Sequence, residues 1–371
     1  MYAWKRPFAA LLCLLLLGTT PAAAQTDTPP YDQQVDAEMA AYYPEDIATV
    51  PWAEDTILDL VHADIVKGYD IADGRVAVHP NATITRAEFV ALLVRALHLQ
   101  KAANAQSFVD VPATSWYYDV ISTASSLGIV NGVSSNRFAP TKNIRRDEIA
   151  KILAVAFAQS VNFNGPSTPF QDVGTYWARP YINQVSAAGI VNGYDASGGQ
   201  AFRPAKNASR AEAMTMLQRA LKKQSYALPN DIALKNLVLA NEDAFYNNYK
   251  ANDWAKQLTA QAQYMTGEAK RRADFNVHFI QQQAARGATM QITRDTEPTA
   301  AILSKSDQFA VVQLKNANYT ATLNAPNLQG EETKFDAGAI LYLRKLPNGD
   351  WKIYSATPTA EEEVQGGLNA S

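Results

Sequence analysis

Three arginines, Arg86, Arg146 and Arg210, each stand two residues before a glutamate and six residues after a proline. A planar guanidinium can hold a carboxylate through two charge-assisted hydrogen bonds. We expect each arginine to lie in the first turn of a helix, where unpaired backbone N–H groups and the helix dipole also favour an anion. The arginines are therefore candidates for binding an anionic ligand, against the alternative of salt-bridged or solvated side chains.

Tryptophan, glycine and aspartate recur at matching positions around these arginines. Sixteen residues separate Trp52 from Gly68, and the same interval recurs in two further units. An indole can lie on an apolar ligand face while its N–H donates, or it can anchor a helix in the core, and we weigh the two equally. The glycine is expected to supply a left-handed residue after a helix rather than room for a ligand. The aspartate is expected to cap or orient the first helix, with direct ligand binding as the lesser alternative. The complete candidate set is Arg86, Arg146, Arg210, Trp52, Trp116, Trp177, Gly68, Gly132, Gly193, Asp46, Asp110 and Asp172.

Agreement in these intervals indicates an internal repeat of three units. After Trp116, apolar residues at Ile121, Ala124 and Leu127 predict an amphipathic helix that ends near Gly128. A loop of variable length follows, and a second helix begins at the Arg-x-Glu element. In the first and third units Thr85-Arg86-Ala87-Glu88 and Ser209-Arg210-Ala211-Glu212 predict capping boxes. Each unit is therefore predicted to be helix, loop and helix.

Several short motifs resemble those of the S-layer homology (SLH) family, over about half of the chain from Tyr43 to Leu221. They are Phe108-x-Asp110-Val111, Phe170-x-Asp172-Val173, Gly-Ile-Val-Asn-Gly at 128–132 and at 189–193, and Ile84-Thr85-Arg86-Ala87-Glu88. The resemblance implies an all-α, pseudo-threefold fold whose grooves bind secondary cell-wall polysaccharide, typically through pyruvylated amino sugars. The arginines would then hold the pyruvyl carboxylate and the tryptophans would stack on sugar rings, so the twelve candidates become carbohydrate-binding candidates.

The three units depart from the family pattern in different ways. Unit one has Pro44 in place of the leading Phe, Asp64 in place of Gly, and Val78-His79-Pro80 in place of Phe-x-Pro. Unit two has Arg145 where a hydroxyl cap is usual, and unit three has Ala208 where Ile is usual. We expect the groove built on unit one to be the least competent of the three.

The N-terminus has the order of a secretory signal peptide. Lys5 and Arg6 precede an apolar run from Phe8 to Leu17, and small residues at 22–24 predict cleavage before Gln25. The single cysteine, Cys13, would leave with this leader, so no disulfide, thiol nucleophile or Cys-based metal site is expected. No later segment has the length of a transmembrane span. The expected location is secreted, at the cell wall and cell surface.

Composition narrows the partners further. A formal net charge of -3 argues against nonspecific nucleic-acid binding. The four histidines show no metal-ligand spacing, so neither a metal nor a cofactor is expected.

The C-terminal third changes pattern to helices followed by strands. Apolar spacing predicts one helix from about Leu234 to Tyr249 and another from about Glu268 to Arg286. Strands are predicted at 289–294, 300–303, 309–315, 319–323 and 339–344, with a hairpin turn at 347–350 leading into Trp351-Lys352-Ile353-Tyr354. This order resembles the NTF2-like α+β cone, a fold whose members include enzymes and pure binding domains.

These patterns divide the chain into a leader, three repeats and one further domain. The predicted limits are a signal peptide at 1–24, a linker at 25–42, repeats at 43–100, 101–160 and 161–223, a linker at 224–232, the α+β domain at 233–358 and a flexible tail at 359–371. The leading hypothesis is a wall-anchored protein that presents a binding or spacer domain with an unknown small-molecule or protein ligand. The alternatives are a wall-anchored enzyme with its active site in the cone, although no catalytic constellation stands out, and a surface-lattice component.

Overall fold

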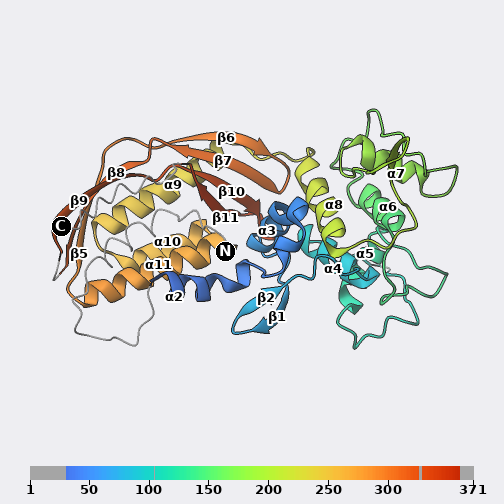
Figure 1. Cartoon of the computed structure of the whole chain (residues 1–371), viewed down its shortest axis with the longest axis horizontal. Helices are drawn as coiled ribbons and strands as arrows, with labels where there is room; N and C mark the ends of the chain where they lie inside the picture. The colour runs from blue at the N-terminus through green and yellow to red at the C-terminus, as the bar shows by residue number, and fades with distance from the viewer. Residues whose placement is uncertain (1–30, 104, 326–327, 360–371) are drawn as a thin grey trace.

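The computed structural model describes residues 31–103, 105–325 and 328–359. The predicted signal peptide and nearly all of the predicted tail lie outside these residues. Figure 1 shows an elongated molecule with the repeats at one end and the C-terminal helices and strands at the other. Within the described part of the chain, no helix is long and apolar enough to cross a membrane.

Each repeat contains the two predicted helices. In the first, the short turns η1 (Ala40–Tyr42), η2 (Ile47–Thr49) and η3 (Pro51–Ala53) lead into α3 (Glu54–His62), and α4 (Arg86–Ala96) follows. The second contains α5 (Tyr118–Ser126) and α6 (Arg146–Ala156), and the third contains α7 (Arg179–Ala187) and α8 (Arg210–Lys223).

The repeats are not entirely helical, which corrects the all-α expectation. Two-stranded hairpins occupy the loops of the first and third repeats, as β1 (Tyr69–Ala72) with β2 (Arg75–Ala77) and β3 (Tyr194–Ala196) with β4 (Gly199–Ala201). Both hairpins turn through residues with positive φ, Asp73 and Gly74 in one and Gly198 and Gly199 in the other. The loop of the second repeat is shorter and forms no strand.

A closed ring of backbone hydrogen bonds joins the three repeats at their centre. Ile84 N donates to Ala208 O at 3.2 Å, Ala208 N donates to Ile144 O at 2.9 Å, and Ile144 N donates to Ile84 O at 2.9 Å. One residue from each repeat therefore gives and receives one bond. This hub gives the assembly its pseudo-threefold symmetry, and one continuous apolar core surrounds it.

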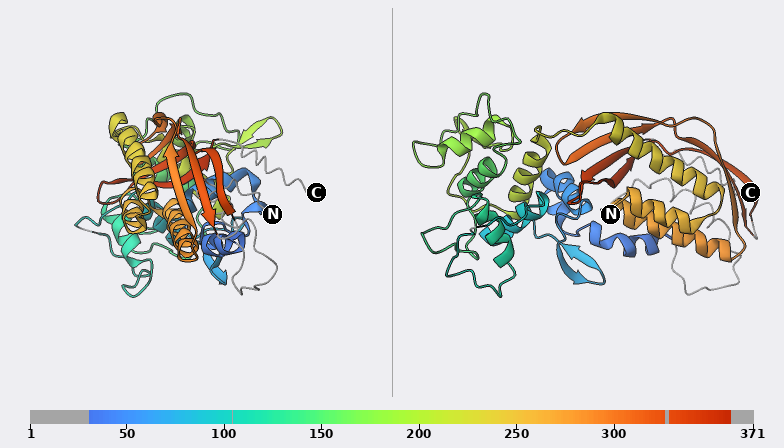
Figure 2. Two further views of the ribbon diagram at one scale, coloured as in Figure 1. Left: turned by 90° about the vertical axis from the view of Figure 1, so that its left-hand side faces the viewer. Right: turned by 180° about the vertical axis from the view of Figure 1, so that it is seen from behind.

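Among the residues that the structure describes, three helices and seven strands make up the C-terminal domain. The helices are α9 (Asp231–Lys250), α10 (Trp254–Tyr264) and α11 (Gly267–Ala285). The strands are β5 (Thr289–Arg294), β6 (Thr299–Lys305), β7 (Phe309–Lys315), β8 (Asn318–Ala325), β9 (Leu328–Asp336), β10 (Ala339–Lys345) and β11 (Trp351–Pro358). They form two antiparallel sheets, with strand orders β11-β10-β7-β6 and β5-β8-β9, which bend around the helices (Figure 2).

Helix α10 and strand β9 of this domain, and helix α2 ahead of the first repeat, were not predicted. Helix α10 buries Gln257 and Gln261 instead of an apolar stripe, so its sequence lacks a strong helical period. Strand β9 is mostly polar, and its pairing with β8 supplies the order that its own residues do not. Helix α2 (Tyr31–Met39) lies in the segment expected to be a linker. It packs on α11, where Glu38 pairs with Arg271 at 2.9 Å.

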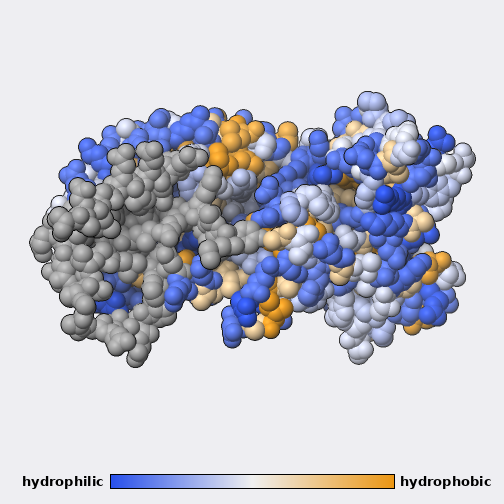
Figure 3. Space-filling view, viewed as in Figure 1, coloured by the Kyte–Doolittle hydropathy of each residue, from blue (hydrophilic) through white to orange (hydrophobic). Residues whose placement is uncertain are grey.

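The surface of the repeats that faces the viewer in Figure 3 is mostly hydrophilic, and hydrophobic residues there occur in small separate patches. The apolar side chains instead fill two cores, one in the repeats and one in the C-terminal domain. Two C-terminal residues, Phe309 and Tyr354, belong to the core of the repeats. The two parts of the molecule are therefore joined by packing as well as by the chain.

Candidate ligand-binding grooves between the repeats

The repeated aspartates hold the aromatic-x-Pro segments. Asp110 accepts hydrogen bonds from Phe138 N at 2.8 Å and from Ala139 N at 2.9 Å, one on each carboxylate oxygen. Although partial burial raises it, these backbone bonds hold the pKa of Asp110 below its ordinary value. The same pair of bonds joins Asp46 to Val78 and His79, and Asp172 to Phe202 and Arg203. Of the expectation that these aspartates cap or orient the first helix, the capping part is wrong, because each carboxylate fixes a distant loop and the N-caps of α5 and α7 are Tyr117 and Ala178.

These loops need holding because their middle residue is left-handed without being glycine. The φ angles are 49° at His79, 58° at Ala139 and 56° at Arg203. Such a conformation costs a non-glycine residue on the order of 1 kcal/mol. The two bonds to aspartate stabilise it, and the strained turn presents residue 79, 139 or 203 to the surface.

Each repeated arginine reaches from its own helix into the next repeat. Arg146 Nε donates to Phe202 O at 2.8 Å, and its Nη1 lies 3.6 Å from Glu212 Oε1. Arg86 makes the corresponding bonds to Phe138 O and Glu148, and Arg210 makes them to Val78 O and Glu88. Arg86 is 5% exposed, Arg146 3% and Arg210 8%. The three side chains therefore lie at the base of the inter-repeat contacts and not in solvent.

The repeated glutamates divide their two oxygens between two repeats. Glu88 Oε2 accepts the bond from Thr85 N at 2.7 Å, and Glu88 Oε1 accepts from Arg210 Nη1 at 3.2 Å. The capping boxes predicted at Thr85 and Ser209 are confirmed. In the second repeat, Glu148 still accepts from Arg145 N at 2.8 Å although the hydroxyl is missing. Each glutamate therefore caps its own helix and also fixes the arginine of the preceding repeat.

The first amides of these helices are already bonded. Arg146 N donates to Lys206 O at 3.0 Å, and Asp147 N donates to Pro204 O at 3.1 Å. Arg86, Ala87, Arg210 and Ala211 make the equivalent bonds. The expectation that unpaired amides at these helix starts would help to hold an anion is therefore wrong.

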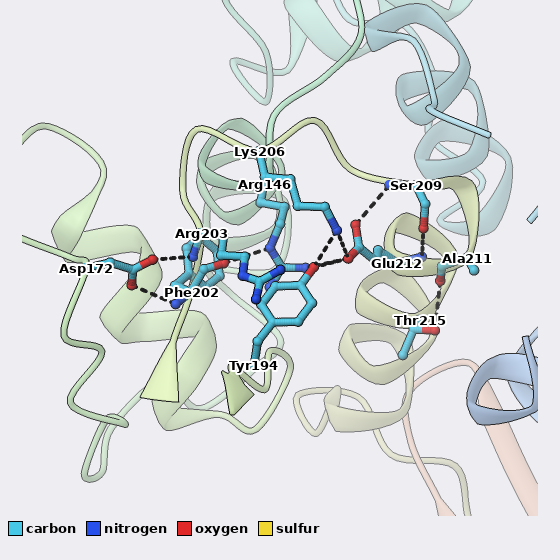
Figure 4. Close-up of polar contacts among 10 residues, drawn as sticks. All are labelled: Arg146, Asp172, Tyr194, Phe202, Arg203, Lys206, Ser209, Ala211, Glu212 and Thr215. Atoms are coloured by element: carbon cyan, nitrogen blue, oxygen red, sulfur yellow. Dashed lines mark hydrogen bonds and ion pairs between the residues drawn. The ribbon is translucent and has the colours of Figure 1, made fainter. Parts of the chain in front are cut away.

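At the contact between the second and third repeats, three cationic side chains surround the ring of Tyr194 (Figure 4). The centroid of the Tyr194 ring lies 4.7 Å from Arg146 Cζ, 4.2 Å from Arg203 Cζ and 4.9 Å from Lys206 Nζ. Tyr194 donates through its hydroxyl to Glu212, and Lys206 Nζ lies 2.9 Å from the same carboxylate. We call Tyr194, Arg203 and Lys206, with Arg146 and Glu212 beneath them, the cation cluster.

Burial and charge differ within the cation cluster. Arg146 is buried, and this burial lowers its pKa, although a guanidinium stays charged at any physiological pH. Burial opposes the charge of Lys206 as well, but hydrogen bonds to Tyr194 and Glu212 outweigh it and raise the Lys206 pKa. The side chain of Lys206 is 43% exposed, and Arg203 is also exposed. Two cations therefore remain open to solvent above one buried cation.

The other two inter-repeat contacts lack this combination. Where Arg210 meets the first repeat, the positions of Tyr194, Arg203 and Lys206 are taken by Tyr69, His79 and Ala82. Where Arg86 meets the second repeat, they are taken by Val133, Ala139 and Lys142. The three contacts thus share the same hydrogen-bond pattern, and at these positions the cation cluster has the most cations.

The three tryptophans are at the surface. Trp52, Trp116 and Trp177 are 60%, 65% and 49% exposed, so the interpretation that they anchor the first helix in the core is wrong. An exposed indole offers a flat apolar face of the kind that stacks on a sugar ring.

Most of the repeated glycines serve close packing. A Cβ on Gly132 would lie 2.4 Å from Ser134 O, and one on Gly193 would lie 2.7 Å from the Phe170 ring. Neither has a positive φ. The left-handed residues after the first helices are Gly128 and Gly189, with Asp64 in the first repeat. Only Gly68 is itself left-handed, at φ 70°, so the turn interpretation of the three glycines is wrong for Gly132 and Gly193.

The described residues contain no group of three or more histidine, cysteine, aspartate or glutamate side chains placed to hold a metal ion.

Comparison with known proteins identifies the repeats. The S-layer homology domain matches residues 45–90, 107–150 and 169–214. A surface-layer 125 kDa protein of Lysinibacillus sphaericus is 33% identical over 172 residues, which is 46% of this chain and 14% of that protein. The S-layer protein sap of Bacillus anthracis is 29% identical over 177 residues, covering 47% of this chain and 20% of that protein. An amylopullulanase of Thermoanaerobacterium thermosulfurigenes is 33% identical over 177 residues, covering 46% of this chain and 9% of that protein.

The chain thus spans a fifth or less of the length of these relatives. The three S-layer homology domains and the S-layer relatives support a cell-surface, cell-wall-associated location.

Proposed function

We propose that the three S-layer homology domains anchor this protein by binding an anionic secondary cell-wall polysaccharide, typified by a pyruvylated glycan, in the grooves between repeats. The observation that carries the proposal is the cation cluster, in which Arg203 and Lys206 stand exposed above the buried pair of Arg146 and Glu212. Its two outer cations can bind a fixed carboxylate on a sugar through charge-assisted hydrogen bonds.

In this proposal the twelve candidate residues have different roles. The arginines Arg86, Arg146 and Arg210 shape the base of each groove and supply positive potential from below. The aspartates and glycines hold the loops, and the exposed tryptophans Trp52, Trp116 and Trp177 stack on sugar rings of the same polymer. Several weak sites on one chain gain affinity from effective concentration, so firm anchoring needs no single tight pocket.

Sedimentation with purified walls tests the proposal. The double variant Arg203→Ala with Lys206→Ala should pellet with walls on the order of tenfold or more weakly, because charge-assisted bonds contribute about 1.5–3 kcal/mol each. The control is Lys315→Ala with Lys334→Ala, which removes the same charge from exposed sites on the C-terminal domain. Walls stripped of their non-peptidoglycan polymer should bind neither the parent protein nor the two double variants. Equal binding of the two double variants, or binding to stripped walls, would contradict the proposal.

For the C-terminal domain we propose an NTF2-like cone that acts as the displayed binding or spacer module. The packing of α9, α10 and α11 against two bent antiparallel sheets supports this assignment. The S-layer lattice remains the third hypothesis, and the assembly state of the purified chain in solution tests it.

One observation favours the alternative of a wall-anchored enzyme. Glu242 is buried in the helical layer, accepts a hydrogen bond from the Tyr319 hydroxyl, and has its pKa raised by burial to about 7. Such a carboxyl can exchange a proton near neutral pH. A small-molecule ligand whose binding is lost in Glu242→Gln would support an enzyme or a receptor over a spacer, and turnover of that ligand by the parent protein would separate the enzyme from the receptor.

A further inference from the structure

We propose that the first S-layer homology repeat is a dock for the C-terminal domain, so that the wall anchor and the displayed module form one rigid body. This surface is separate from the ligand grooves, and the proposal does not depend on which glycan they bind. It follows from the contacts of α3, from one glycine, and from the differences between the first repeat and the other two.

Asp59 of α3 is the first polar anchor of the dock. Its carboxylate accepts a hydrogen bond from Tyr354 Oη of β11 at 2.5 Å. It also binds Gln218 Nε2 at 2.7 Å and Lys222 Nζ at 2.8 Å, both from α8. The Tyr354 side chain is buried, and its ring belongs to the core of the repeats. Asp59 therefore fastens a C-terminal strand to two repeats at once.

A second set of polar contacts surrounds the end of α3. His62 Nδ1 lies 3.0 Å from Ser355 Oγ, on the same strand as Tyr354. Tyr43 bridges the Glu268 and Arg272 pair of α11, with 2.9 Å from Arg272 Nη2 to the Tyr43 hydroxyl. The Glu268 side chain is buried, the Arg272 side chain is mostly buried, and the two bond each other at 2.6 Å. The ion pair lies within α11 itself, and the contact across the interface is the pair of hydrogen bonds that the Tyr43 hydroxyl makes to it.

Gly267 shows how closely the two parts approach. It begins α11 with φ 55°, and a Cβ built on it would lie 2.0 Å from the backbone oxygen of His62. No side chain fits there unless the α3 backbone or α11 moves. The glycine is therefore required by the dock and not only by its own turn.

The residues of the dock are those in which the first repeat differs from its neighbours. Counted from the tryptophan of each repeat, Asp59, His62 and Asp64 are all ionisable. The corresponding residues are Thr123, Ser126 and Gly128 in the second repeat and Gln184, Ala187 and Gly189 in the third. Asp64 accepts a bond from Tyr42 at 3.3 Å and interacts electrostatically with Arg344 of β10. The departures of the first repeat thus coincide with contacts to the C-terminal domain.

The chain crosses between the two parts twice, which limits hinge motion. Helix α2 packs on α11 before the chain enters the first repeat, and α9 follows α8 after the third. The second connection is itself held down, because Ala227 N donates to Asp307 at 2.8 Å and Lys305 Nζ donates to Pro229 O at 2.9 Å. Over the described part of the chain, two fixed connections and a packed interface therefore join the anchor to the module.

Distance measurement by double electron–electron resonance tests the dock in the full chain. A Cys13→Ser background removes the single native cysteine, and spin labels go on Val109→Cys in the second repeat and Ile232→Cys on α9, both exposed positions. We expect one narrow distance distribution. Gly267→Ala should broaden or shift this distribution, whereas Gly287→Ala should not. Gly287 also has a positive φ, but a Cβ there meets nothing within 4 Å.

A second variant covers the case in which Gly267→Ala does not fold. Tyr354→Phe keeps the buried ring but removes the bond to Asp59, and it should broaden the distribution while the far-ultraviolet circular dichroism stays native. A broad or multiple distribution in the parent protein would overturn the proposal. So would a narrow, unshifted distribution in both folded Gly267→Ala and folded Tyr354→Phe.

Discussion

Arg146 Nε donates a 2.8 Å hydrogen bond to Phe202 O, so helix α6 of the second repeat holds the loop of the third repeat. The same relationship joins Arg86 to Phe138 and Arg210 to Val78. Each repeat is therefore completed by its neighbour.

Arg146→Ala should destabilise the protein by roughly 1–3 kcal/mol, because it leaves the buried Phe202 carbonyl without its donor and leaves Glu212 with Lys206 as its remaining cation. Urea denaturation followed by circular dichroism measures the loss. Arg146→Lys should recover only part of it, since an ammonium lacks the planar fork. The exposed Arg179→Ala serves as the control and should change stability by less than about 0.5 kcal/mol. Similar losses in Arg146→Ala and Arg179→Ala would contradict the structural role of Arg146.

Ala139→Gly should stabilise the protein by at most about 1 kcal/mol, because glycine adopts the φ of 58° found there without steric cost, while its greater freedom in the unfolded chain offsets part of the gain. Thermal unfolding at fixed pH measures the gain. Ala158→Gly, outside the left-handed region, should be neutral or destabilising instead. A lower melting temperature in Ala139→Gly would show that the loop carries no such strain.

The buried Glu242 should make stability fall as the pH rises. Burial raises the pKa of Glu242 from 4.5 to about 7 in the folded protein, and the hydrogen bond from Tyr319 opposes this only in part. The stabilisation is therefore complete below pH 4.5 and is lost as the pH rises toward 7, by about 3 kcal/mol in all. Glu242→Gln should remove this slope and raise stability at pH 8. The denaturant midpoints of the parent protein and of Glu242→Gln are measured from pH 4.5 to pH 8. If the two midpoints depend on pH in the same way, Glu242 is not the source of the slope.

His62 should act in the opposite direction. Burial lowers its pKa below 6.5, and its Nε2 has no partner among the residues that the structure describes. Nearby Glu268 and Asp59 favour the charged form, whereas burial and Arg272 outweigh them. In the unfolded chain His62 takes up a proton near pH 6.5, whereas in the folded chain it does so only at lower pH. Its contribution to stability is therefore complete above pH 6.5 and decreases as the pH falls below that value.

His62→Gln should therefore weaken the loss of stability between pH 6.5 and 5 relative to the parent protein. The variant keeps a polar group near Ser355 but does not titrate. The distance distribution between spin labels on Val109→Cys in the second repeat and Ile232→Cys on α9 should broaden in acid in the parent protein and not in the variant. Identical acid broadening in the variant would assign the effect to other groups.

Local sequence patterns predicted the elements that depend on neighbouring residues. The capping boxes at Thr85 and Ser209 are confirmed because both partners lie within one helical turn. The predicted strands are also confirmed, since their apolar alternation or turn residues are local. The twelve candidates fall on the repeats as a set, and the arginines do meet the loops of the neighbouring repeat.

Contacts between distant residues could not be predicted in this way. Nothing near Asp110 indicates that its partners are Phe138 and Ala139, and the left-handed φ of Ala139 has no signal in an alanine. The position of α2 against α11 depends on the tertiary fold. The repeat itself could have suggested the cation cluster, because only the third unit combines Arg203 with Lys206, whereas the counterparts are His79 with Ala82 and Ala139 with Lys142.

The hydrogen-bond ring through Ile84, Ala208 and Ile144 also fixes how many copies the assembly can contain. Each copy gives one arginine forward and receives one from behind, and the last copy returns to the first. Deleting one copy, or inserting a fourth, would leave an unpaired guanidinium at one end and an unpaired glutamate at the other unless the whole ring changed its curvature. Gene duplication can lengthen an open solenoid one unit at a time, but it cannot gradually extend a closed triangle such as this one.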